Sequence, residues 1–146
     1  MSKSAMKVAP QSVVLHSSAV LEWIYVERTT ETLAQAMETV ITRGAWVPAH
    51  WRLEVASVLE HNTRHRRHDH IFRNETLRDL SLLAIQVDAE THGRAWEMTL
   101  EIAVRRNVSV YDAAYVELAL RRGLPLVAVE AAVRRAAQAE DVVVLG

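Results

Sequence analysis

The decisive stretch of this sequence is Asn107-Val-Ser-Val-Tyr-Asp-Ala-Ala-Tyr-Val-Glu-Leu-Ala-Leu120, which leads through Arg-Arg-Gly-Leu-Pro into the apolar run Leu126-Val-Ala-Val129. From position 110 to 120 nearly all residues are apolar, which predicts a helix buried on most sides. Asp112 interrupts this run. Two interpretations are open. Ser109 and Asp112 have the spacing of a capping box at the start of the helix, or the carboxylate of Asp112 faces apolar neighbours and needs a cation.

Strand and helix patterns alternate on both sides of this stretch. Short apolar runs rich in β-branched residues predict strands at Val13–Leu15, Ala45–Val47, Ile85–Val87, Leu126–Val129 and Val142–Leu145, and the first has the pattern of a strand buried on both faces. Helices are predicted between them, at residues 19–26, 29–43, 49–59, 72–83, 89–106, 110–120 and 130–138. Such alternation predicts an α/β fold of three layers, α/β/α, with a short, mostly parallel central sheet and right-handed crossovers. Residues 13–146 form this domain, and residues 1–12 are predicted to be a flexible leader.

The composition of the 146 residues limits the class of protein. This length suits one domain. The sequence has no cysteine, which excludes disulfides and thiolate metal sites and favours a reducing compartment. Neither a signal peptide nor a membrane-spanning run is visible, so we expect a soluble cytoplasmic protein. The net charge of -1 argues against a generally basic nucleic-acid binder.

Several local features carry their own structural predictions. Ser17 or Ser18 is predicted to cap the helix at residues 19–26, and Asp88 the helix at residues 89–106. His92 and Trp96 lie one helical turn apart. We expect this pair to pack against the rest of the domain.

Residues 61–70 contain four histidines and three arginines. The plainest interpretation is a solvated helix end followed by a turn. A surface that faces RNA phosphates is a second interpretation. A metal site from His61 and His65, or from His68 and His70, is a third.

Four polar residues follow the predicted strands at the positions where ligands bind in open parallel sheets. They are His16, Glu54, Asp112 and Glu130. Each has a structural explanation, since an acid in the first turn of a helix stabilises the helix dipole and His16 fits a turn. Three carboxylates on one rim nevertheless repel each other unless a divalent cation lies between them, and oxygen ligands suit magnesium or manganese.

Four segments of the sequence resemble a PIN domain of the VapC toxin type, in order and in spacing. They are Val14-Leu-His-Ser-Ser-Ala-Val-Leu-Glu-Trp23, Pro48 to Leu59, Val108-Ser-Val-Tyr-Asp-Ala-Ala-Tyr115 and Leu126-Val-Ala-Val-Glu130. The resemblance covers about residues 13–145. It implies a PIN-like fold and a ribonuclease that depends on Mg2+ or Mn2+. It also implies a homodimer held by a small VapB-like antitoxin.

The resemblance assigns roles to individual positions. Glu54 and Asp112 stand where the family places acidic metal ligands, and Ser109 matches a hydroxyl beside them. Two positions differ from the family pattern: His16 replaces an aspartate, and Glu130 replaces a residue that is typically aspartate. The resulting prediction is a catalytic set of Glu54, Asp112, Glu130 and Ser109, with His16, Glu54, Asp112 and Glu130 as metal ligands.

His16 removes a negative charge and an oxygen ligand from this predicted site. Its ring nitrogen suits manganese or zinc better than magnesium. A non-catalytic PIN-like module that binds an antitoxin or RNA is therefore an alternative. A small-molecule phosphatase or a receiver domain is another, although a receiver would have an acidic pair at the first strand and a lysine after the last.

The first predicted helix suggests an interface. Trp23, Ile24 and Tyr25 are large apolar residues in a row near its end. One short helix in a small domain does not readily bury all three, so we expect part of this surface at a subunit or antitoxin interface.

Overall fold

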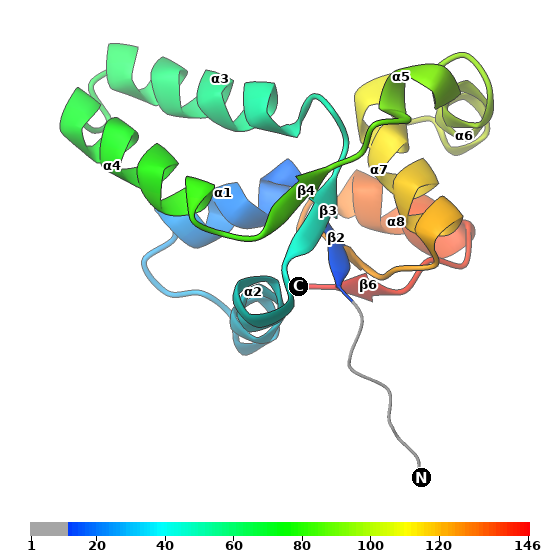
Figure 1. Cartoon of the computed structure of the whole chain (residues 1–146), viewed down its shortest axis with the longest axis horizontal. Helices are drawn as coiled ribbons and strands as arrows, with labels where there is room; N and C mark the ends of the chain where they lie inside the picture. Colours follow the sequence, from blue (N-terminus) through cyan, green and yellow to red (C-terminus); the bar gives the residue numbers. More distant parts are fainter. Residues whose placement is uncertain (1–11) are drawn as a thin grey trace, which may run out of the picture.

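The computed structural model describes residues 12–146, and the strands found there form one parallel sheet of five (Figure 1). The strands are β2 (Val13–Leu15), β3 (Ala45–Val47), β4 (Ile85–Val87), β5 (Leu126–Val127) and β6 (Val144–Leu145), in the order β4-β3-β2-β5-β6. The predicted α/β class is confirmed. The predicted leader falls almost entirely on residues 1–11, which lie outside the described part of the chain.

Helices cover both faces of the sheet, with α1 to α4 on one side and α5 to α8 on the other in Figure 1. Their bounds are α1 Ser17–Tyr25, α2 Glu31–Arg43, α3 Trp51–Arg64, α4 His70–Ser81, α5 Thr91–Arg94, α6 Met98–Arg106, α7 Val110–Arg122 and α8 Ala131–Ala139. None of these helices has both the length and the apolar character needed to cross a bilayer.

The strand order reverses beside β2. The chain builds outward from β2 through β3 to β4, then crosses the sheet and places β5 against the other side of β2. In this register Val14 pairs with Trp46 on one side and with Leu126 on the other. The carboxyl ends of β2 and β5 therefore flank the point of reversal, which is where open α/β sheets bind ligands.

Helix α7 is the buried helix that the sequence predicted. Its residues from Ala113 to Ala119 are all buried. Ser109 caps its beginning, and Gly123 ends it in the left-handed conformation at φ 64°, which glycine adopts at little cost. Since α7 packs against β2 and β5, its first turn reaches the carboxyl edge of the sheet.

The prediction of a single helix at residues 89–106 is wrong, because the chain forms two helices there, α5 and α6. Glu97 has φ -114° and ψ -113°, outside the helical region, and separates α5 from α6. The intervening turn carries Trp96 outward, where 91% of its surface is exposed. His92 is exposed as well. The predicted packing of this pair against the domain is therefore wrong.

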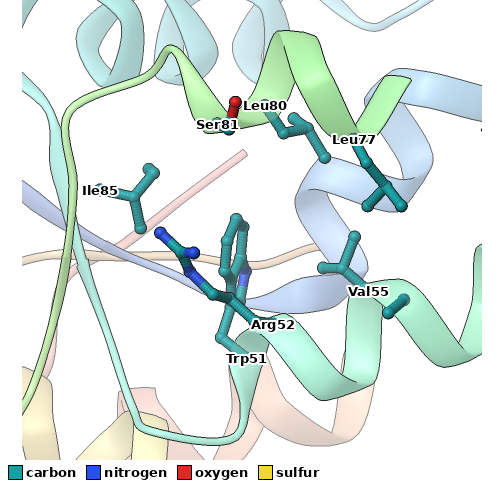
Figure 2. A pocket seen from close by; sticks show the side chains of 8 residues that line it. Trp51, Arg52, Val55, Leu77, Leu80, Ser81 and Ile85 are labelled. Carbon is teal, nitrogen blue, oxygen red and sulfur yellow. The ribbon is translucent and has the colours of Figure 1, made fainter. Parts of the chain in front are cut away.

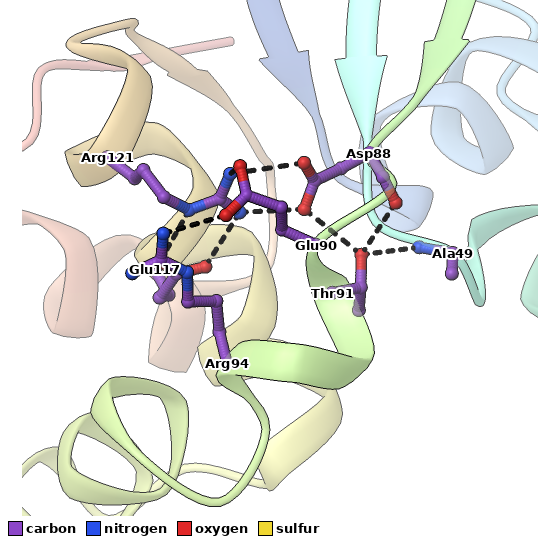
Figure 3. A network of polar contacts seen from close by, with 7 residues as sticks. All are labelled: Ala49, Asp88, Glu90, Thr91, Arg94, Glu117 and Arg121. Atoms are coloured by element: carbon purple, nitrogen blue, oxygen red, sulfur yellow. Dashed lines mark hydrogen bonds and ion pairs between the residues drawn. The ribbon is translucent and has the colours of Figure 1, made fainter.

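Asp88 does not cap this segment either, since the N-cap of α5 is Glu90. The carboxylate of Asp88 instead accepts hydrogen bonds from Arg121 at 2.7 and 3.1 Å and one from the Thr91 hydroxyl at 3.2 Å (Figure 3). Arg121 also binds Glu117, with 2.8 Å between Nε and Oε2. One guanidinium thus joins the end of β4 to the last turns of α7.

This arginine neutralises two carboxylates that are almost completely buried. Asp88 is 2% exposed and Glu117 is 4% exposed. Burial opposes ionisation of Asp88, but the hydrogen bonds and charge of Arg121 hold the pKa of that carboxyl below its ordinary value. Glu90 and Arg94 extend the network, as Figure 3 shows, and both of these side chains are partly exposed.

A second ion-pair cluster, at Glu140, predicts a defined dependence of stability on pH. Arg105 and Arg106 each place Nε 2.7 Å from Oε2 of Glu140. The hydrogen bond from Arg105, followed by that from Arg106, lowers the pKa of Glu140 from 4.5 to about 2, although burial opposes the shift. A carboxyl whose pKa is lower in the folded state than in the unfolded state stabilises the protein at pH values above the unfolded-state pKa. This stabilisation is lost as the pH falls to the folded-state pKa.

We therefore expect Glu140→Gln to lower the free energy of unfolding at neutral pH. The deficit should shrink between pH 4.5 and about 2. Urea unfolding of both proteins across this range measures it. Glu101→Gln is the matched control, because Glu101 is an exposed partner of Arg105 at 4.0 Å and its loss should matter little at any pH. A Glu140→Gln deficit that stays constant down to pH 2 would contradict the assignment.

Candidate functional site

His16 follows β2 directly and begins α1. Its Nδ1 accepts a hydrogen bond from the backbone N–H of Ser18 at 3.0 Å, so His16 itself is the N-cap. The predicted capping by Ser17 or Ser18 is wrong. An imidazole nitrogen acts here as the acceptor that an aspartate or serine oxygen usually supplies.

This cap determines where the ring carries its proton. Because Nδ1 accepts from an N–H, the hydrogen-bond network assigns the proton to Nε2. Nε2 lies 2.9 Å from Oδ1 of Asp112 and donates to it. His16 is only 2% exposed. The hydrogen bond from His16 is the main cause that lowers the pKa of the Asp112 carboxyl, even though burial opposes it.

The two interpretations of Asp112 do not exclude one another. Ser109 caps α7 by accepting a hydrogen bond from the backbone N–H of Asp112 at 3.0 Å. The side chain of Asp112 meanwhile faces His16. The serine therefore satisfies the helix end, and the carboxylate is available to the site.

The predicted site residues line one pocket of about 360 Å³ at the carboxyl edge of the sheet. Its walls include all five of them, which are His16, Glu54, Ser109, Asp112 and Glu130. They come from four segments of the chain, since Ser109 and Asp112 share the start of α7, and the strand order brings these segments together. The remaining lining residues are Ser17, Ser18, Leu21 and Tyr111.

Three of these side chains are close enough to share one cation. His16, Asp112 and Glu130 each offer a ligand atom, and these atoms lie within 4.8 Å of one another. It is the one group of this kind within residues 12–146. Two carboxylates and one imidazole fit a divalent cation that accepts both oxygen and nitrogen, such as manganese. The ring of His16 would have to lose its Nε2 proton to become a ligand.

Glu54 lies on the same pocket but outside this group of three. Its Oε1 accepts a short hydrogen bond from the hydroxyl of Tyr115. Burial and the nearby negative charge of Glu54 raise the pKa of Tyr115, so its hydroxyl remains a donor. Nε2 of His50 lies 3.9 Å from the same Oε1. Tyr115 thus fixes the carboxylate of Glu54 on the pocket wall.

Sequence reasoning missed Tyr115, His50 and Tyr111 as parts of the site. Tyr115 had a usable signal, since it follows Asp112 by three residues and shares its helical face. His50 also had one, because it follows the end of β3. Tyr111 had none, because an aromatic residue in the first turn of a helix is most simply explained by packing.

An apolar pocket of about 250 Å³ lies apart from these carboxylates, between α3 and α4. Figure 2 shows Trp51 rising into the space between Ile85 and Val55, with Leu77 and Leu80 on the α4 side. The indole nitrogen of Trp51 is buried and has no hydrogen-bond partner. No acid lines this pocket among the described residues, so it is not a second metal site.

The stretch at residues 61–70 connects α3 to α4 and packs partly against α1. Nε2 of His68 lies 2.7 Å from the Tyr25 hydroxyl, and the guanidinium of Arg67 stacks over the Tyr25 ring at 4.8 Å. The rings of His61 and His65 are 4.2 Å apart. No third ligand joins either predicted histidine pair in the described part of the chain, so the structure gives no support to a metal site there.

Comparisons with known proteins agree with this fold. The profile of the PIN domain family matches residues 13–139. The crystal structure of PAE2754 from Pyrobaculum aerophilum is similar, with a TM-score of 0.66 and 19% sequence identity over 92% of this chain and 83% of that chain. At this identity the similarity shows the fold alone. A comparison with curated proteins gives no match.

Proposed function

Because this chain belongs to the PIN-domain family, a family of metal-dependent nucleases, we propose that it is a divalent-metal-dependent ribonuclease, a toxin of the VapC type. The observation that supports this most is the approach of His16, Asp112 and Glu130 to within 4.8 Å. Carboxylates brought this close favour a cation between them.

The proposed mechanism assigns a task to each side chain. Asp112 and Glu130 would hold the cation, with Glu54 as a further oxygen ligand on the pocket wall. When bound, a divalent cation supplies Lewis-acid chemistry, drawing charge from a phosphate oxygen and making water easier to deprotonate. Ser109 and Tyr115 position two of these acids: Ser109 fixes the first turn of α7, and Tyr115 holds Oε1 of Glu54.

His16 has a separate task in this proposal. Its Nε2–H places a donor against Asp112, where the family pattern has a third aspartate. The same hydrogen bond favours the second candidate function, a PIN-like module that binds an antitoxin or RNA without cutting it. A donor already bound to Asp112 competes with any cation for that carboxylate.

The proposed partners are RNA as substrate, a VapB-like antitoxin and a second copy of the chain. Support for a protein partner comes from Trp23, Ile24 and Tyr25, which pack against the core yet remain only partly buried. Light scattering tests the dimer. Co-purification with a small protein from a neighbouring reading frame tests the antitoxin.

Cleavage of a mixed RNA pool tests the enzymatic function. We expect cleavage in manganese that exceeds cleavage in magnesium, and none in EDTA. Asp112→Asn removes one ligand charge and should lower the rate by ~10-fold or more, since even the loss of a residue behind a ligand typically costs 10 to 100-fold. RNA that is bound but never cut, in either metal, would instead support the binding module.

A further inference from the structure

Tyr111 is an exposed aromatic residue beside the most important carboxylate of the site. It precedes Asp112 in the first turn of α7 and lines the same pocket. Although it belongs to the most buried helix of the domain, 65% of its surface is exposed. Packing therefore does not explain the ring.

The ring is exposed but held in place. Nε2 of His50 donates a hydrogen bond to the backbone carbonyl of Tyr111 at 3.1 Å. The two rings meet edge to face, with 5.5 Å between centroids and an interplanar angle of 73°. His50 in turn packs edge to face on the buried ring of Tyr115 at 5.5 Å. The hydrogen bond fixes the backbone that carries the ring and the edge-to-face contact supports one side of it, so part of the ordering cost is met before a ligand contacts Tyr111.

The charges around the pocket show why such a ring is needed. Glu54, Asp112 and Glu130 line it, and no arginine or lysine of the described chain does. Without a cation this surface repels the phosphates of a nucleic acid. Aromatic stacking on a base does not depend on phosphate charge, and every base has a face that can stack. Tyr111 is the aromatic side chain of the lining that offers such a contact.

We infer that Tyr111 is a base-stacking platform that seats one nucleobase beside the phosphate to be cut and thereby selects unpaired RNA. Bases within a duplex are already stacked on their neighbours, whereas the bases of loops and single strands can stack on a protein ring. This inference rests on the proposed function, because it places the RNA on the acidic pocket.

The affinity of the protein for one short RNA, offered single-stranded and as a duplex, tests the inference. Binding is measured in manganese with an RNA whose backbone cannot be cleaved, so that a cation offsets the repulsion between the acids of the pocket and the phosphates. Tyr111→Ala should weaken single-strand binding by about 5- to 150-fold, the usual effect of removing a stacking ring, and leave duplex binding unchanged. Tyr111→Phe keeps the ring and should retain most of the affinity. In a metal that supports cleavage, Tyr111→Ala should raise KM more than it lowers kcat.

Trp96→Ala is the matched control. Trp96 is even more exposed but does not line the pocket, so its loss should leave RNA affinity unchanged. Equal single-strand affinity of Tyr111→Ala and the unaltered protein would overturn the inference and leave the proposed function standing. So would a loss in Tyr111→Phe as large as in Tyr111→Ala. If the unaltered protein bound no RNA with or without metal, the proposed function itself would fail.

Discussion

His16→Asp is expected to raise the rate of magnesium-dependent RNA cleavage by ~10-fold or more, which corresponds to ~1.4 kcal/mol of barrier. The substitution replaces a nitrogen donor with the hard oxygen that magnesium prefers. It also removes the Nε2–H that occupies Oδ1 of Asp112, so both oxygens of that carboxylate become available to the cation.

The local structure should tolerate this change. His16 caps α1 by accepting from the backbone N–H of Ser18, and aspartate is among the best N-cap residues. The new carboxylate adds repulsion to Asp112 and Glu130 when no metal is bound. We therefore expect the variant to unfold at a lower temperature in EDTA than the unaltered protein. It should also gain more stability from magnesium, because a ligand that binds only the folded state stabilises it.

Three proteins test the predicted effect of His16→Asp: the unaltered chain, His16→Asp, and His16→Asp combined with Asp112→Asn. Each is assayed on a mixed RNA substrate and by thermal unfolding, in magnesium and in manganese. The double variant is the control, since it has one carboxylate fewer and should lose the gain. If the unaltered protein already cuts as fast in magnesium as His16→Asp, His16 is a competent part of the site and does not impair cleavage.

Arg121→Ala is expected to destabilise the protein by ~3–5 kcal/mol, the usual result when one partner of a buried ion pair is removed. Asp88 and Glu117 would remain buried without a cation. Each would then have to take up a proton or draw in water. A loss of this size lowers the midpoint of thermal unfolding by on the order of 10 °C in a domain of this length.

Arg94→Ala is the matched control for Arg121→Ala. Arg94 pairs with Glu90 at 2.7 Å in the same network, but both side chains are largely exposed. Exposed pairs contribute about 0–1 kcal/mol. Chemical denaturation of both variants at neutral pH measures the difference. If both variants lost the same free energy of unfolding, burial of Asp88 and Glu117 would not be the cause of the destabilisation.

The strands were predictable because their signal is local. The runs at Val13–Leu15, Ala45–Val47 and Ile85–Val87 form strands with the predicted bounds. Burial on both faces explains the first, an unbroken apolar run in the middle of the sheet, whereas Ile85–Val87 lies at the edge and is largely exposed. β5 and β6 are shorter than predicted. It was also predictable that the polar residues following the strands lie close to one another, because the carboxyl ends of parallel strands share one edge of the sheet.

The details that were missed depend on contacts between distant parts of the chain. Asp88 has the sequence context of a helix cap, but Arg121 lies 33 residues later and binds its carboxylate instead. The helix break at Glu97 has no proline to announce it. The hydrogen bond from Tyr115 to Glu54 spans 61 residues. Sequence periodicity describes which face a residue occupies, not which partner it meets there.

Helix α7 is fastened at both ends to different strands of the sheet. Its first turn is joined through Asp112 to His16 at the end of β2, and its last turn through Arg121 to Asp88 at the end of β4. The helix therefore cannot slide along its own axis when only one of these attachments opens. If a cation displaces the proton between His16 and Asp112, the far anchor still sets the position of the helix. In the proposed metal site, exchange of that proton for a metal ion would therefore need a change of side chains alone, with the backbone fixed by the far attachment.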